Sequence, residues 1–185
     1  MNSDKWQILD DEGTMLEGKG DYKQAALVAQ KAIKAAERCY GRNHINVATA
    51  LDQLVELYWY MLDQPAKAEP LLRRSLAIRQ KALGTDHPET ATTLNNLAAL
   101  LDTLGKFSEA EPLYRQSVAV HEKLYGPDDP DVALILDSLG ACLAAQDRFA
   151  EAEMVLSKAL DIRKKVSPPG HASVAETAAK LAEVR

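Results

Sequence analysis

The chain has 185 residues, 46% of them hydrophobic, 5% aromatic and 26% charged, and its net charge is −5 at pH 7. The scarcity of aromatics favours a helical protein over a β protein, and without a lysine or arginine run we expect no nucleic-acid partner. The N-terminus lacks a signal-peptide pattern, and no apolar stretch approaches the roughly 18 residues of a membrane span. We therefore expect a cytoplasmic protein without a membrane partner.

One pattern returns every 42 or 43 residues along the chain. Residues 40–44 are repeated at 83–87 and at 125–129, and a degenerate copy ends at 170–171. A period of this length is typical of solenoids, whose units bury their apolar faces only against neighbouring units. We predict an all-α, right-handed solenoid that forms a single domain over residues 1–185. Its predicted units are four helical hairpins and a C-terminal capping helix, at about residues 3–40, 44–83, 87–125, 129–166 and 171–185.

The first two hairpins depart from the shared pattern. In the opening helix, expected at residues 2–19, Glu12 occupies the register that Leu54 fills one repeat later. The second hairpin carries one extra residue between Leu57 and Asp63. The copies are therefore unequal, although the repeat continues through them.

The third hairpin shows the pattern most clearly. Pro88 stands in the first turn of its first helix, Leu94 and Leu97 begin an apolar stripe with helical steps, and Gly105 ends that stripe. A second helix is expected from Phe107 onward. Its inward-facing residues are expected to be Ala110, Tyr114, Ser117 or Val118, and Leu124 or Tyr125.

A small residue holds one register in the second helix of every hairpin, which indicates that the two helices approach closely there. The four copies of this residue are Ala25, Ala68, Ala110 and Ala152. At the start of the fourth hairpin, Asp129 is a good N-cap.

The third hairpin resembles a tetratricopeptide repeat (TPR) in residues 94–98, 105–107 and 110–114, which read LNNLA, GKF and AEPLY. The 42-residue spacing and the His-Pro between units are similar to the kinesin-light-chain type of this repeat. The resemblance covers nearly the whole chain. It implies a TPR solenoid that acts as a protein-interaction scaffold, with the first helix of each hairpin lining a concave groove.

No catalytic motif is present in the sequence. The run Gly18-Lys19-Gly20 lacks the third glycine of a dinucleotide-binding fingerprint. His121-Glu122 lacks the second histidine, four residues on, that a zinc-protease motif needs. We therefore expect neither an enzyme nor a cofactor.

Three histidines, His44, His87 and His171, share one repeat position, which raises a metal-binding alternative. Packed helices lie about 10 Å apart, too far for one ion whose ligand bonds are near 2 Å. We therefore favour helix-start residues and expect no metal. Cys39 and Cys142 stand at apolar positions of different repeats and are expected to be buried, reduced thiols.

The resemblance places Asn95 and Asn96 in the concave groove, where asparagine side chains can bind a peptide backbone through their amide donors and acceptors. Trp59 or Tyr60 is a candidate aromatic anchor, because Tyr58 is expected in the core and successive helical residues point about 100° apart. In the alternative interpretation, the asparagines are surface polar residues and the aromatics pack against an adjacent hairpin.

The charges are segregated between the two helices of the hairpins. The predicted first helices at 45–62, 88–104 and 130–146 contain no lysine or arginine, and each carries two acids, whereas the second helix at 65–83 has five bases against Glu69. This predicts an acidic concave face and a more basic outer face; the alternative is a solvated surface without a ligand.

Kinesin light chains bind acidic peptides through basic groove residues, and chaperone-binding TPR domains also need lysine and arginine on their first helices. A different ligand is therefore expected here.

We predict a protein-interaction scaffold that binds a basic or amphipathic peptide or helix in its groove. The candidate peptide-binding residues are Asp52, Glu56, Trp59, Tyr60, Asn95, Asn96, Asp102 and Asp137. Two alternatives stay open: a structural module that self-associates into a homo-oligomer, and the interaction part of a larger signalling protein.

Overall fold

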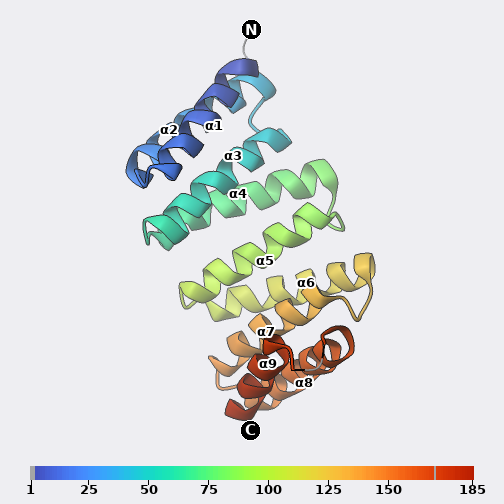
Figure 1. Cartoon of the computed structure of the whole chain (residues 1–185). Coiled ribbons are helices and arrows are strands. Elements are labelled where there is room, and N and C mark those ends of the chain that lie inside the picture. The colour runs from blue at the N-terminus through green and yellow to red at the C-terminus, as the bar shows by residue number, and fades with distance from the viewer. Residues whose placement is uncertain (1–2, 169) are drawn as a thin grey trace. The chain divides into compact units, whose positions relative to one another are not determined.

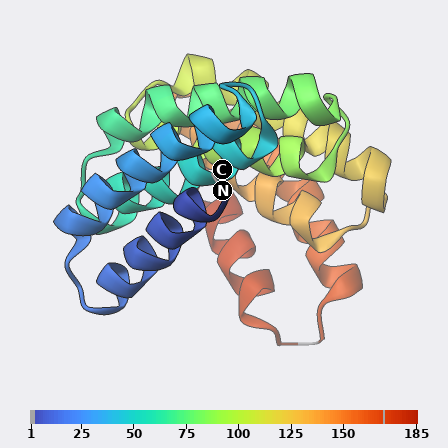
Figure 2. The same ribbon diagram turned by 90° about the horizontal axis from the view of Figure 1, so that it is seen from above.

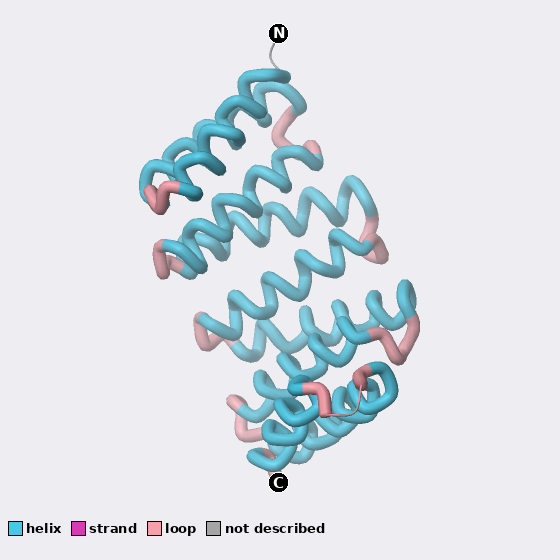
Figure 3. The backbone as a smooth tube through the Cα atoms, in the orientation of Figure 1, coloured by secondary structure: helices cyan, strands magenta, loops and turns pink. Residues whose placement is uncertain are grey.

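The computed structural model describes residues 3–168 and 170–185, and these residues form helices joined by short turns, with no strand among them (Figure 3). This confirms the all-α prediction. Residue 2, where the opening helix was expected to begin, lies outside the described residues. The chain groups into two compact units, Met1–Thr85 and Asp86–Arg185, and each is described by itself. The expectation of a single domain stays a prediction.

The first unit contains two helical hairpins. Helices α1 (Ser3–Gly18) and α2 (Tyr22–Tyr40) run alongside each other in opposite directions (Figures 1 and 2). Helix α3 (Ile45–Glu56) continues into a short π-helix, η1 (Leu57–Met61), and then turns back into α4 (Pro65–Leu83). Helix α2 also packs against α3 and so joins the two hairpins.

The second unit contains two more hairpins and a last single helix. Helix α5 (Pro88–Thr103) pairs with α6 (Phe107–Tyr125), and α7 (Pro130–Ala144) pairs with α8 (Phe149–Val166). Helix α9 (Ala172–Glu183) packs against α8. Consecutive helices therefore pack in chain order within this unit, as in a helical solenoid.

Four helices begin with the same type of cap at one repeat position. The Nδ1 atoms of His44, His87 and His171 accept hydrogen bonds from the backbone N–H groups two residues on, at 3.2, 3.2 and 3.3 Å. Asp129 accepts from the N–H of Asp131 in the same way, at 2.9 Å. Each cap satisfies an N–H group that the first helical turn leaves without a partner. The prediction that the shared histidines are helix-start residues, and Asp129 an N-cap, is confirmed.

The turns inside the hairpins also share a register. Their left-handed residues are Gly20, Asp63, Gly105 and Asp147, with φ angles of 76°, 51°, 71° and 59°. Glycine adopts this conformation without a steric cost, and aspartate is among the few other residues that tolerate it. The repeat therefore alternates the two residue types that suit a tight reversal.

The extra residue of the second hairpin is absorbed as the π-helix. The Leu62 N–H donates to the carbonyl of Leu57, five residues earlier, at 2.9 Å. A π-turn takes in one residue more than an α-turn and is frequent at functional sites. Within this π-helix, Tyr58 was expected in the core but is half-buried, and its hydroxyl accepts from Gln30 Nε2 at 2.7 Å.

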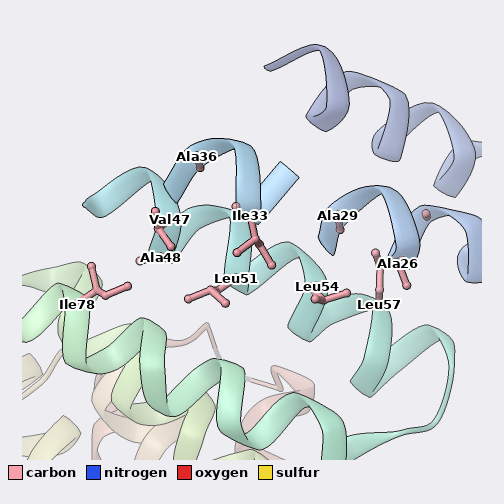
Figure 4. Packing of buried hydrophobic residues seen from close by; sticks show 12 residues of the cluster. Ala26, Ala29, Ile33, Ala36, Val47, Ala48, Leu51, Leu54, Leu57 and Ile78 are labelled. Atoms are coloured by element: carbon pink, nitrogen blue, oxygen red, sulfur yellow. The ribbon is translucent and has the colours of Figure 1, made fainter. Parts of the chain in front are cut away.

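The core of the first unit lies between α2, α3 and α4. Small residues of α2, such as Ala29 and Ala36, face larger ones of α3, such as Leu51 and Leu54, and Ile78 of α4 joins the same cluster (Figure 4). The short alanine side chains let the helix backbones approach while the leucines fill the space between them. The first unit thus gains a packed interior that neither hairpin could make alone.

The close approach within each hairpin rests on the small-residue register. Its four alanines are fully buried, with 0% exposure at Ala25, Ala68, Ala110 and Ala152. In the fourth hairpin the facing residue of α7 is Gly140, where an added Cβ would lie 2.6 Å from Leu156 Cγ on α8. No side chain fits there without moving a buried leucine.

One detail of the third hairpin was predicted wrongly. Leu124 or Tyr125 was expected to face inward, but the two residues are 38% and 52% exposed, and His121 one turn earlier is buried instead. Helix α6 has 19 residues and its partner α5 has 16, so α5 is too short to cover all of α6.

The cysteines are free thiols; Cys142 is buried as expected, whereas Cys39, next to the end of α2, is only half-buried.

The replacement Gly140→Ala is expected to destabilise the second unit. The new methyl group would overpack the contact with Leu156, at a cost of roughly 1–3 kcal/mol, which thermal unfolding followed by circular dichroism would measure. Gly18→Ala is the matched control, because a Cβ there meets nothing within 4 Å, and a helical alanine is then neutral or stabilising. Equal melting curves for the two variants would contradict the close approach of α7 and α8.

Candidate functional site

Two of the predicted groove acids form ion pairs within their own hairpins. Asp52 Oδ2 on α3 lies 2.7 Å from Arg79 Nη1 on α4, and its Oδ1 accepts from Ser75 Oγ at 2.6 Å. Asp137 Oδ2 on α7 lies 2.5 Å from Arg163 Nη2 on α8. In each case a base of the second helix neutralises an acid of the first.

The hypothesis that Asp137 contacts a peptide needs correction. Its side chain is buried, with 3% exposure, and its two oxygens also accept from Thr177 Oγ1 of α9 at 3.0 and 2.9 Å. Asp137 therefore joins α7, α8 and α9, and no ligand reaches its carboxylate. Asp52 keeps part of its side chain exposed, but its charge is already matched by Arg79. The sequence pattern missed these pairs because the compensating arginines lie on the other helix of the hairpin.

Glu56 ends α3, and Trp59 and Tyr60 follow it in the π-helix η1. We name Asp10, Glu17, Glu56, Trp59 and Tyr60 the acidic aromatic patch. Burial, and then the negative charges of Glu56 and Asp10, raise the pKa of Glu17 above its usual value. Burial and Glu56 also raise the pKa of Tyr60. Glu17 therefore lies within electrostatic range of Glu56 and Asp10. Asp10 and Glu17 belong to α1, where the sequence analysis proposed no site residue.

The two aromatic rings of the patch stack on each other and are partly exposed. The rings of Trp59 and Tyr60 stack with centroids 4.6 Å apart. Trp59 is half-buried, whereas Tyr60 is 63% exposed, and Glu56 beside them is also exposed. One carboxylate oxygen of Asp10 is buried without a hydrogen-bond partner. The patch therefore combines an exposed tyrosine ring with one buried carboxylate oxygen that has no hydrogen-bond partner.

In the second unit, Asp102 lies in a partly buried position on α5. Burial raises its pKa, with an opposing contribution from the nearby Cys142 thiol, and its Oδ1 is buried without a hydrogen-bond partner. The same surroundings raise the pKa of Cys142 to about 12, mainly through burial and then through Asp102. The thiol is therefore protonated and unreactive near neutral pH.

The two asparagines of α5 differ in their surroundings. Asn96 is exposed, whereas Asn95 is half-buried and its Oδ1 has no hydrogen-bond partner. Asn95 lines a hollow of about 180 Å³ between α5, α6 and α7. The other lining residues are Thr92, His121, Asp131, Leu134 and Ile135. Sequence reasoning did not find this hollow, although His121 stands in the register of Arg79 and Arg163.

Several bases of the second helices are matched by acids. In the second unit, Arg148, just before α8, forms ion pairs with Glu111 of α6 and with Glu151. Arg115 of α6 lies 2.8 Å from Glu111. In the first unit, Arg74 of α4 pairs with Glu37 of α2. The expected basic character of the second-helix face is therefore reduced by ion pairs.

The eight candidate residues fall into two sets. Asp52, Glu56, Trp59 and Tyr60 belong to the first unit, whereas Asn95, Asn96, Asp102 and Asp137 belong to the second. Glu56, Trp59 and Tyr60 lie together in the patch; Asn95 lines the hollow; Asn96 is exposed.

Over the described part of the chain, no group of three or more His, Cys, Asp or Glu side chains could hold a metal ion. No described helix is long and apolar enough to cross a membrane.

Removing Asp137 is expected to destabilise the second unit strongly. Asp137→Ala would leave Arg163, which is 13% exposed, without its partner, and breaking a buried pair in this way costs roughly 3–5 kcal/mol. Chemical denaturation would measure the loss. Asn96→Ala, an exposed change on α5, serves as the control. An unchanged midpoint for Asp137→Ala would mean that its carboxylate is solvated.

A stabilising change is expected at Asp102. Because folding raises its pKa, its ionisation opposes folding; this penalty is absent below the unfolded pKa of about 3.9 and grows as pH rises through the folded value. Asp102→Asn removes the charge and should therefore raise Tm by a few degrees at pH 7 and hardly at all at pH 3. Asp161→Asn, an exposed change on α8, should not show this pH dependence. A lower Tm for Asp102→Asn at pH 7 would contradict the argument.

Comparison with known proteins identifies relatives of the repeat. A family model described as tetratricopeptide repeat matches residues 8–81, 60–123 and 104–165. Over 82 residues, 44% of this chain, the sequence is 35% identical to the clustered mitochondria protein homolog of Homo sapiens. The aligned part of this chain spans only 6% of the length of that relative.

Solved structures share the fold at low sequence identity. BtubC (BKLC) from P. vanneervenii has a TM-score of 0.81 and 22% identity, covering 96% of this chain and 70% of that chain. A putative kinesin light chain of Podosopora anserina with nearly identical TPR-like repeats has a TM-score of 0.82 and 20% identity, covering 97% of this chain and 85% of that chain. Together with the family match, these similarities confirm the predicted TPR solenoid.

Proposed function

The chain belongs to the tetratricopeptide repeat family, and from that premise we propose that it is a protein-interaction scaffold whose first-helix face binds a basic or amphipathic peptide or helix. A scaffold role in general fits both the family and the fold. The choice of a basic ligand rests on the charges of this chain. It is independent of what the structural relatives bind, since they share only the fold.

The acidic aromatic patch carries the proposal. Helices α3, α5 and α7 contain no lysine or arginine, so the chain itself supplies no base on these helices. The raised pKa of Glu17 reflects its burial and the repulsion from Glu56 and Asp10. A ligand cation would reverse that repulsion, because an opposite charge within about 4–6 Å favours the ionised carboxylate. An acidic ligand would add to the repulsion.

The aromatic pair supports the same ligand class. A lysine or arginine over the face of Trp59 or Tyr60 gains a cation–π interaction of about 0.5–1 kcal/mol at an exposed site. Aromatic side chains are also frequent among the residues that contribute most to binding at interfaces. Acids beside an exposed ring thus suit a basic segment with some apolar surface.

The proposal can be tested with two designed peptides of equal length, one rich in lysine and arginine and one with glutamate at the same positions. The basic peptide is expected to bind more tightly, and more weakly as salt rises, because salt screens exposed charges. Glu17→Gln with Glu56→Gln should weaken this binding about three- to tenfold, since exposed ion pairs contribute up to about 1 kcal/mol each. Fluorescence anisotropy would measure the affinities.

A charge-matched variant gives the control. Glu109→Gln with Asp161→Asn removes the same net charge from exposed positions on α6 and α8, and it should leave the affinity nearly unchanged. If both double variants weaken peptide binding equally, the loss of affinity comes from the net charge of the protein and not from the patch. Tighter binding of the acidic peptide would overturn the proposal. Light scattering on the free protein tests the self-association alternative, which requires a mass that rises with concentration.

A further inference from the structure

The two helices of a hairpin meet along a contact that we call the seam. One pair of facing positions in this seam differs between the hairpins. The first-helix residue is Asp52, Asn95 or Asp137, and the second-helix residue one turn beyond the shared serine or alanine is Arg79, His121 or Arg163. In the second and fourth hairpins these residues form the Asp–Arg ion pairs described above. In the third hairpin the same positions hold an asparagine and a histidine. The third hairpin therefore lacks the guanidinium group that its two neighbours contain.

The hollow of about 180 Å³ lies where that group is missing. Asn95 of α5 and His121 of α6 line it together with Thr92, and Asp131 and Ile135 line it from α7. Since one water molecule occupies about 30 Å³ in the liquid, the hollow has room for several waters or for the end of one long side chain. Its volume thus suits the end of one long side chain.

The polar groups around the hollow are acceptors. His121 Nδ1 lies 2.9 Å from the carbonyl oxygen of Ser117, and because a carbonyl only accepts, Nδ1 donates its proton to it, which leaves Nε2 as the ring nitrogen that can accept when the ring carries one proton. The Thr92 hydroxyl donates its proton to the carbonyl of Pro88 at 3.1 Å. The Asn95 Oδ1 acceptor is buried and has no partner.

Two further features select a cation. Asp131, in the first turn of α7, brings a carboxylate to the rim and offsets the positive end of the helix dipole. Ile135 gives an apolar surface against which the methylene stem of a long side chain can pack. A guanidinium group carries five N–H donors and no acceptor, so it matches a hollow lined by acceptors better than a water or a carboxylate does.

We propose that this hollow is a subsite for one arginine side chain of the bound partner, which takes the place that Arg79 and Arg163 fill in the neighbouring hairpins. The proposal deepens the proposed function, on which it rests, by naming the residue type that the third hairpin recognises. The partner's arginine would donate to Asn95 Oδ1 and to Asp131 while its stem packs against Ile135.

The direct test uses the full chain and a small probe. N-acetyl-arginine amide, titrated at millimolar concentrations and followed by NMR, should shift the side-chain signals of His121 and Asn95. N-acetyl-citrulline amide, which has the same shape without the charge, should shift them much less. Equal shifts with the citrulline probe, or no shift with the arginine probe, would overturn the subsite.

A variant that fills the hollow from within gives the second arm. Asn95→Asp with His121→Arg recreates the Asp–Arg pair of the neighbouring hairpins and keeps the net charge. It should abolish the arginine-probe shifts. It should also weaken the binding of the basic peptide at least about tenfold, because that is the change in affinity expected when one charged hydrogen bond is lost. Asp131→Asn, an exposed change that preserves the fold, should weaken the probe as well. Thr103→Asp, an exposed change on the same helix but outside the hollow, is the control and should leave probe binding intact.

The outcomes separate the two proposals. If the basic peptide binds and responds to the Glu17 and Glu56 changes but not to the Asn95 and His121 changes, the subsite is wrong and the proposed function stands. If the arginine probe binds the hollow while no basic peptide binds the chain, the proposed function is wrong and the subsite stands.

Discussion

The two helices of each hairpin can approach closely only because small residues line their contact, and the rest of the structure depends on this approach. Ala25, Ala68, Ala110 and Ala152 are fully buried at one register, and Gly140 leaves no space for a Cβ beside Leu156. Close backbones bring the large side chains of each helix into the gaps of the next, which gives the density of a packed interior. They also bring polar residues of the two helices into direct contact across the seam.

Those polar contacts explain why the acids of the first helices have different roles. A buried Asp–Arg pair gains little net stability, although breaking it is costly, so Asp137 and Arg163 act mainly to hold α7, α8 and α9 in one arrangement. Where the pair is replaced by Asn95 and His121, the seam is left with a hollow and unused acceptors. A change at one repeat position thus converts a structural contact into a candidate for recognition.

The extra residue of the second hairpin has a comparable effect in the first unit. The π-helix Leu57–Met61 takes up the insertion without disturbing the small-residue contact that follows at Ala68. It also carries the stacked Trp59 and Tyr60 next to Glu56. Both candidate recognition features therefore occur where one copy departs from the repeat.

The sequence by itself determined what is local or periodic. The repeat length, the helices, the capping role of His44 and Asp129, and the buried alanine register follow from spacing, because helix geometry turns a fixed spacing into a fixed face. Only the tertiary structure decided what each side chain meets across the seam. Asp137 and Asp102 are both acids of first helices, yet one forms an ion pair with Arg163 and the other lies near the Cys142 thiol, since the partner depends on which residue the facing helix presents after it packs.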